Sequence, residues 1–215
     1  MDKADNRSNT LLFLLQVIAI LLLAIAIRTV ALRGMPLFSD EGHHITRAQA
    51  IAMGELFAGF EHNKWLYTAI LALFRPLGPE GVWIGRFLSA LYGVATTAGC
   101  IALGTILGSR RAGLLAGLLY AAVPMAVFHE RQALVDPQLT AFATFSILLG
   151  LHLARRPRVW VGVLLFLTLA VAYLTKATGL SFFVLPFAAI LFWSPSLLDA
   201  LKSTLIAGVA DFAAL

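Results

Sequence analysis

Two adjacent carboxylic acids, Asp40 and Glu41, follow the first hydrophobic run of the chain. A carboxylate held near lipid hydrocarbon is energetically costly, so acids kept at such a position point to a function. One of them can take a proton from a hydroxyl while its neighbour orients it or holds a ligand. The pair also suits a structural role, because acids in the first turn of a helix interact favourably with the helix dipole.

Further ionisable residues recur at the ends of later apolar runs: Lys64, Arg86, Arg131, Asp136 and Lys176. Cations opposite an acidic pair are suited to holding a phosphate-bearing substrate. Each also has an ordinary interpretation, either as a lysine whose amine extends toward water or as a charged turn between spans. Taken together, these residues predict a site for a charged substrate at the membrane surface.

Four histidines are expected on the same side of the membrane as the acids Glu41 and Glu61: His43, His44, His62 and His129. Imidazole and carboxylate groups are common ligands of divalent metals. A compact ligand motif such as His-Glu-x-x-His does not occur in the sequence. We therefore expect no metal centre and no required cofactor, with a bound divalent ion as the alternative.

The composition predicts a membrane protein rather than a soluble one. Of 215 residues, 60% are hydrophobic and 13% are charged, and the mean hydropathy is +0.88. Soluble domains have about 45–50% apolar and about 25% charged residues. The net charge of +5 comes from residues at span ends, where they orient helices or meet anionic lipid rather than nucleic acid. The single cysteine, Cys100, excludes an intrachain disulfide.

The hydropathy pattern predicts an all-α, polytopic transmembrane helical bundle formed by residues 1–215 as one module. We expect about six complete spans, at 11–32, 82–107, 112–128, 138–154, 159–175 and 179–192. A seventh apolar run begins near Ser203, and its roughly 13 residues are too few to cross a bilayer. This pattern predicts that the chain stops inside a span, either as the N-terminal part of a longer protein or as a natural truncation.

The stretch 33–81 predicts an extracytoplasmic loop with two amphipathic helices. Ser39 is a candidate cap for the first helix, in which Asp40, His44 and Arg47 share one polar face. The second helix, about 64–74, is roughly 16 Å long and too short to cross. Both helices are therefore expected to lie in the membrane interface.

Clustered arginines indicate the orientation. The loops at 108–111 and 155–158 are rich in arginine and fall on the side of the N-terminal tail, which the positive-inside rule makes cytoplasmic. The other side holds a similar number of basic residues, but these are dispersed and accompanied by acids. The candidate site then faces the periplasm or exterior of a cytoplasmic (inner) membrane.

Five short elements together resemble the polyprenyl-phosphate-dependent glycosyltransferases of the GT-C type. The resemblance is strongest to the branch with protein O-mannosyltransferases and the aminoarabinose transferase of lipid A. The elements are Asp40-Glu41, Asn63-Lys64-Trp65-Leu66-Tyr67, the run Gly85-Arg86 to Gly93, the run Arg131 to Pro137, and the run Leu174 to Gly179. Their order and spacing carry the resemblance more than any single element.

The resemblance implies transfer of a sugar from a lipid-linked phosphate to a hydroxyl of a lipid, glycan or protein, with inversion. The leaving phosphate is already a stable anion, so a single base suffices, and Asp40 is the candidate, with Glu41 orienting it or the acceptor. Cations would hold the donor phosphate. We assign these roles to Lys64, Arg131, Lys176 and Arg86, with His44, Asp136 and Tyr67 as further site candidates.

Two other classes of protein fit the same pattern. A transporter subunit would place its ionisable groups near the middle of the bilayer on broken helices, whereas here they gather at one face. A catalytically inactive membrane scaffold would keep the fold without binding a donor.

Overall fold

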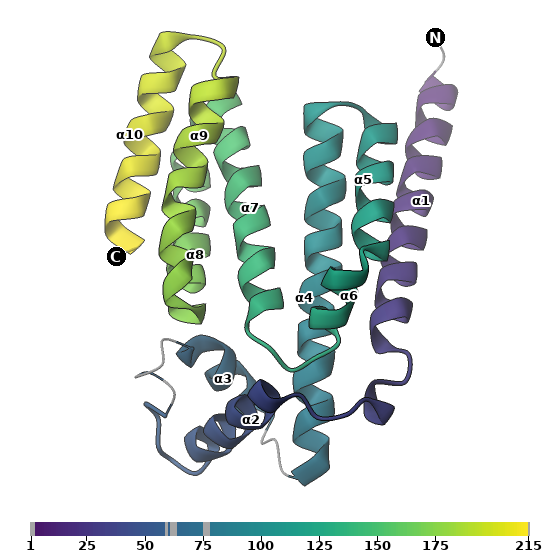
Figure 1. The fold of residues 1–215 in the computed structure, drawn as a ribbon. Helices are drawn as coiled ribbons and strands as arrows, with labels where there is room; N and C mark the ends of the chain where they lie inside the picture. Colours follow the sequence, from purple (N-terminus) through teal and green to yellow (C-terminus); the bar gives the residue numbers. More distant parts are fainter. Residues whose placement is uncertain (1–2, 59, 61–63, 75–77, 215) are drawn as a thin grey trace.

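The computed structural model describes residues 3–58, 60, 64–74 and 78–214, and every regular element within them is a helix (Figure 1). The elements in chain order are α1 (Lys3–Thr29), η1 (Leu32–Gly34), α2 (Ser39–Ala52), α3 (Trp65–Ala72), α4 (Gly78–Leu107), α5 (Arg110–Ala122), α6 (Pro124–Glu130), α7 (Asp136–Arg155), α8 (Val159–Thr175), η3 (Ala177–Phe183), α9 (Val184–Trp193) and α10 (Leu197–Ala214). The predicted all-α class is confirmed.

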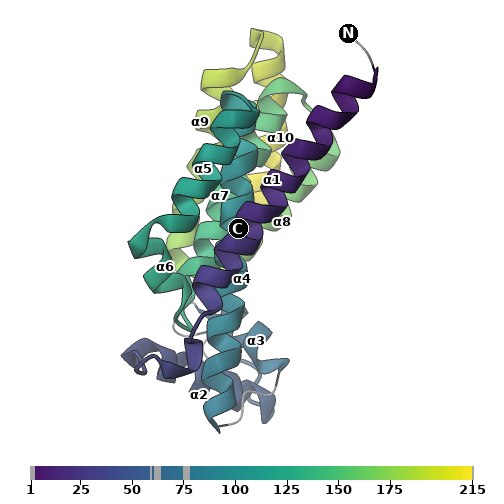
Figure 2. The same cartoon turned by 90° about the vertical axis from the view of Figure 1, so that its right-hand side faces the viewer.

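The long helices form one bundle, and α2 and α3 lie across one end of it (Figure 1). Helix α4 packs on α1, α5 and α7, while α7 packs on α8 and α9, and α8 packs on α10. Figure 2 shows α1 running obliquely across α4. Helices α4 and α7 therefore connect the two halves of the bundle, and the loop helices contact both α4 and α8.

The helices have the length and composition of a membrane protein. Three of them can cross a bilayer by these criteria, at Ser8–Gly34, Glu80–Leu107 and Asp136–Arg155. Helices α5 and α6 pass the test together but are bent by 62° at their junction, and Val159–Thr175 and Ala177–Trp193 are shorter apolar helices. The predicted apolar runs thus coincide with helices, while the count of six complete spans stays a prediction.

Small residues let neighbouring helices approach closely. A Cβ added at Gly104 of α4 would lie 2.9 Å from the Cα of Gly113 in α5, and one added at Gly117 would overlap Ile101. Such glycines are typical of membrane helices, which associate through van der Waals packing where a hydrophobic driving force is absent. The outer face of α1 exposes large side chains, including Leu11, Leu15 and Leu22, as expected of a surface that faces lipid.

The arginine-rich turns lie at the end of the bundle that holds the N-terminus (Figure 1). Arg110 donates to Thr10 Oγ1 at 3.3 Å and its guanidinium lies over the Phe13 ring. Arg155 donates to the carbonyl of Ile106 at 2.9 Å. The structure thus places both clusters on the side of the N-terminal tail, opposite α2 and α3.

Two local predictions about α2 need correction. Phe38, not Ser39, is the N-cap of α2, and Ser39 is already helical. Asp40, His44 and Arg47 do not form one exposed polar face, because His44 is buried against the Tyr67 ring, with ring centroids 5.5 Å apart. The apolar run predicted from Ser203 lies within the longer helix α10, which begins at Leu197.

Candidate functional site

Glu41 is fully buried, and its carboxylate accepts four hydrogen bonds. Arg86 donates to it from Nε and Nη2 at 2.7 and 2.8 Å, and the backbone N–H groups of Ala133 and Phe38 each donate at 2.8 Å. Burial acts to raise the pKa of Glu41, but the bonds from Arg86 and the two amides outweigh it and lower the pKa. Glu41 therefore stays charged and joins α2, α4 and the loop before α7.

Arg86 uses all five of its N–H donors within the protein. Besides its two bonds to Glu41, Nη1 donates to the carbonyls of Leu32 and Met35, and Nη2 donates to the carbonyl of Pro36. A guanidinium has five N–H groups, so none is left for a donor phosphate. The predicted phosphate contact of Arg86 is therefore not supported, and its position is that of a clamp on residues 32–41.

Residues 130–134 lie along a strip of small residues on α4. A Cβ added at Gly85 would lie 2.6 Å from Ala133 Cβ, so this approach requires glycine. One turn further, the hydroxyl of Ser89 donates to the carbonyl of Leu134 at 3.1 Å and accepts from its N–H at 3.3 Å. These contacts explain two of the sequence elements, 85–93 and 131–137, as one packing interface.

Sequence reasoning missed a second buried ion pair, between Arg28 and Glu130. Arg28 Nε lies 2.6 Å from Glu130 Oε2, with exposed side-chain fractions of 0% and 3%, and Tyr120 donates to the other carboxylate oxygen at 2.6 Å. A Cβ at Gly93 would come within 2.6 Å of both partners. The available signal was Arg28 itself, a charge inside the first apolar run, which membrane segments rarely tolerate without a partner.

Asp40 differs from its neighbour, because its side chain is exposed at the start of α2. Its Oδ1 lies 3.5 Å from the Ser39 hydroxyl, at the limit of a hydrogen bond. The acidic pair therefore divides into a buried carboxylate that is bonded to the protein and an accessible one. Only Asp40 has the exposure that a general base needs to meet an acceptor hydroxyl.

His44 lies one helical turn after Asp40 and is buried against Tyr67. Burial, followed by the positive charges of Lys64 and Arg47, lowers the pKa of His44 to about 4, and Asp40 and Asp136 oppose the shift. Tyr67 donates to the carbonyl of Gly85 at 3.1 Å, and burial raises its pKa. Both site candidates are thus neutral near pH 7.

The predicted cations do not all share one environment. Lys176 Nζ lies 2.7 Å from Asp136 Oδ1, and both side chains are partly exposed, at 31% and 48%. Lys64 is half-buried at the start of α3. Arg131 donates to the carbonyl of Val30. The charges of Lys64, Asp40 and Asp136 all act on the pKa of His44, and Lys176 contacts Asp136.

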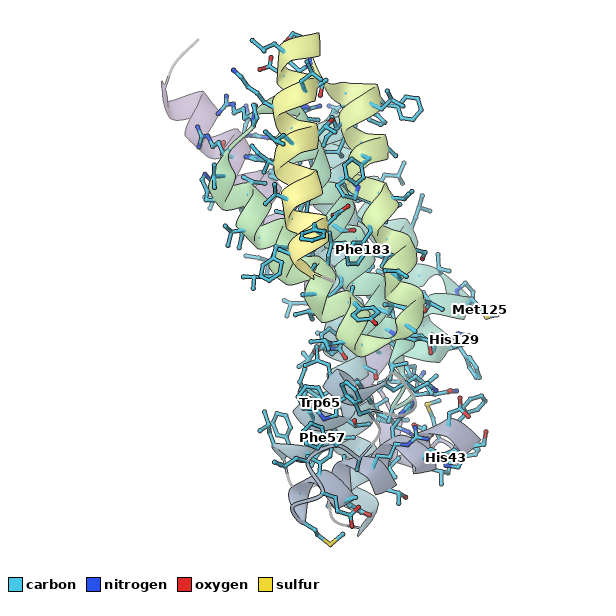
Figure 3. The ribbon with its side chains drawn as sticks, turned by 90° about the vertical axis from the view of Figure 1, so that its left-hand side faces the viewer. His43, Phe57, Trp65, Met125, His129 and Phe183 are labelled. Carbon is cyan, nitrogen blue, oxygen red and sulfur yellow. The ribbon has the colours of Figure 1, made fainter. Side chains whose placement is uncertain are left out.

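The histidines do not assemble a metal centre within the described residues, where no group of three or more His, Cys, Asp or Glu side chains could hold an ion. Figure 3 shows His43 on the loop helices and His129 at the adjoining end of the bundle. His129 Nδ1 lies 2.9 Å from the carbonyl of Met125, within its own helix. His62 and Glu61 lie outside the described residues.

Comparison with known proteins supplies the family. Residues 63–215 match the family model described as dolichyl-phosphate-mannose-protein mannosyltransferase. The match begins after Asp40 and Glu41, so the assignment of the acidic pair rests on its geometry and on the contacts it makes with residues 86 and 133. No curated protein and no solved structure matches the chain. Because the matched region covers well over half of the sequence, the chain belongs to the dolichyl-phosphate-mannose-protein mannosyltransferase family.

Proposed function

We propose that this membrane glycosyltransferase moves a sugar from a polyprenyl-phosphate donor to an acceptor hydroxyl, with inversion and with Asp40 as the general base. The observation that carries the proposal is the division of labour within the acidic pair. Glu41 has four hydrogen bonds to the protein, whereas Asp40 is exposed. A base must be free to approach the hydroxyl whose proton it takes.

The chemistry requires one proton transfer and one bond exchange at the sugar. The acceptor oxygen attacks the anomeric carbon as Asp40 takes its proton, and the bond from that carbon to the phosphate oxygen breaks. The electron pair leaves with the polyprenyl phosphate, which is a stable anion and needs no acid. Fixed positive charges would stabilise the charge that develops on the phosphate.

Lys64 and Lys176 are our choices for those charges, and Arg131 is a third. Lys64 is the N-cap of α3 and Lys176 follows α8, and these two helices contact each other. Asp136 holds Lys176 in place at 2.7 Å while leaving part of both side chains exposed. A lysine retains further N–H donors after one such bond, so a phosphate can bind beside Asp136.

The orientation follows from the clustered arginines. The end of the bundle with Arg110 and Arg155 faces the cytoplasm under the positive-inside rule. The opposite end, with α2, α3 and the candidate site, then faces the periplasm or exterior. A donor with a long prenyl chain would enter from the lipid, and a lipid, glycan or protein hydroxyl would approach from outside.

The test is transfer of labelled sugar from polyprenyl-phosphate donors by the protein in nanodiscs, with donor binding measured separately. Asp40→Asn should bind donor as the wild type does and lose at least about a hundredfold in turnover, the usual size of a general-base contribution. Glu55→Gln is the matched control, because Glu55 is also an exposed acid of this loop. Normal turnover by Asp40→Asn would refute the base assignment. Wild-type protein that binds no donor would instead favour a transporter or scaffold.

A further inference from the structure

The buried pair of Arg28 and Glu130 lies outside the proposed catalytic groups and needs its own explanation. Arg28 Nη1 also donates to the carbonyls of Ala24 and Ala121, each at 3.2 Å, and its guanidinium lies 5.9 Å from the centre of the Tyr120 ring. The pair therefore joins α1 and the end of α6 to the last turn of α5, and α5 and α6 are bent by 62° relative to each other. A buried ion pair is weak support for stability, since apolar residues of similar volume often serve as well.

The pair is connected to the acidic pair by a short, buried piece of backbone. Glu130 ends α6, and three residues later the N–H of Ala133 donates to Glu41. Gln132, Ala133 and Leu134 are all less than 5% exposed. Three residues of backbone reach at most about 10 Å, so fixing Glu130 restricts where the Ala133 amide can lie.

A second connection runs through the end of α1. Arg28 precedes Leu32 by four residues, and the carbonyl of Leu32 accepts from Arg86, which in turn holds Glu41. Arg131 donates to the carbonyl of Val30, between these points. The contacts close a ring from Arg28 through residues 130–133, Glu41 and Arg86 back to the end of α1.

We propose that Arg28 and Glu130 are positioning residues for the proposed transfer reaction: they fix the amide of Ala133 and the chain after α1, and thereby the place of Asp40. The inference rests on the proposed function but is testable without it. Neither residue contacts the reacting atoms. Their effect passes through Glu41, whose carboxylate is fixed by Ala133 and Arg86.

The test uses Arg28→Met, Glu130→Met and the double variant, each in nanodiscs. Each single variant leaves one buried charge unpaired and should lower thermal stability, whereas the double variant removes both charges and should restore it. The positioning role is then tested in the double variant, whose thermal stability should equal that of the wild type. Hydrogen exchange of the amides in residues 131–135 and in the first turn of α2 should be roughly tenfold faster than in wild type.

Kinetics supply the second readout. The double variant should turn over donor at least tenfold more slowly, with a much smaller change in the KM for donor, because Lys64 and Lys176 lie outside residues 131–135 and keep their places while the base is displaced. Gly93→Ala should act in the same direction by intruding on the pair, since its Cβ would lie 2.5 Å from Glu130 Oε2. Gly99→Ala is the matched control on the same helix: its Cβ would meet the Thr144 methyl at 2.6 Å, away from the pair.

Two outcomes overturn the proposal. One is a double variant with wild-type exchange in residues 131–135 and α2, and the other is faster exchange in Gly99→Ala to the same degree as in Gly93→Ala. Exchange does not depend on transfer. A wild-type protein without transfer would therefore count against the proposed function, while the exchange result would still decide the positioning role.

Discussion

Glu41→Gln should destabilise the protein far more than Asp40→Asn. The wild-type carboxylate offers two oxygens, each of which accepts one bond from Arg86 and one from a backbone amide. Glutamine keeps only one of these oxygens, so its NH₂ group must face two N–H donors. The Arg86 guanidinium, 2% exposed, also loses its counter-charge.

The size of the effect follows from these losses. Two hydrogen bonds to a charged group are worth about 3 kcal/mol together, at the lower end of their range. Removing one partner of a buried ion pair costs about 3–5 kcal/mol. The two estimates agree, so we expect the free energy of unfolding to fall by about 3–5 kcal/mol. Asp40→Asn removes an exposed charge and should change it by less than about 0.5 kcal/mol.

Unfolding by SDS in mixed micelles measures this difference directly. Because the pKa of Glu41 is lowered from 4.5, its contribution is complete well above pH 4.5 and is lost as the pH falls below that value. The gap between wild type and Glu41→Gln should therefore be constant near pH 7 and narrow only in acid. If Glu41→Gln lost no more stability than Asp40→Asn, the anchoring role of Glu41 and Arg86 would be wrong.

Three further predictions concern other contacts. The pKa of His44 falls from 6.5 to about 4 on folding, so the free energy of unfolding should decrease by about 1.4 kcal/mol per pH unit as the pH falls from 6.5 toward 4. His44→Gln should remove this pH dependence. Equal free energies of unfolding of the wild type at pH 7 and pH 5 would contradict the burial of His44. Gly85→Ala should lower stability by about 1–3 kcal/mol, because its Cβ would lie 2.6 Å from Ala133 Cβ. Gly42→Ala is the control: it has open space around it and should be neutral or stabilising. Thermal unfolding that ranks the two variants oppositely would refute the close contact between Gly85 and Ala133. Asp136→Asn should change stability by under about 1 kcal/mol, since the pair with Lys176 is partly exposed. Because Asp136 holds Lys176 in place, the KM for donor should rise; an unchanged KM would show that Lys176 does not need Asp136 to bind the phosphate.

The sequence predicts the helices well because their signal is local. The apolar runs around α4, α7 and α8 are long, and their ends carry arginines, prolines and glycines that end helices. The placement of α2 and α3 outside the bundle also follows from composition, since neither is long and apolar enough to cross.

The partners of the charged residues could not be predicted in the same way. Glu41 lies 45 residues from Arg86 and 92 from Ala133, and no periodicity within one helix encodes such a pairing. In the sequence, Arg86 therefore looked like a cation available to bind a phosphate, whereas in the structure five acceptor atoms of the protein take its N–H donors. The role of Gly93 likewise depends on Glu130 approaching from another helix.

The clamp formed by Arg86 also sets an order of events during synthesis. Residues 32–41 leave the ribosome first, but the side chain that holds them lies 45 residues later, and the Ala133 amide lies 92 residues later. At about 5–20 residues per second, the Ala133 amide follows Glu41 by roughly 5–20 s. During that interval the carboxylate of Glu41 lacks the Ala133 amide, and for the first 45 residues it also lacks Arg86. The earliest part of the site to be made is thus the last to take its final shape.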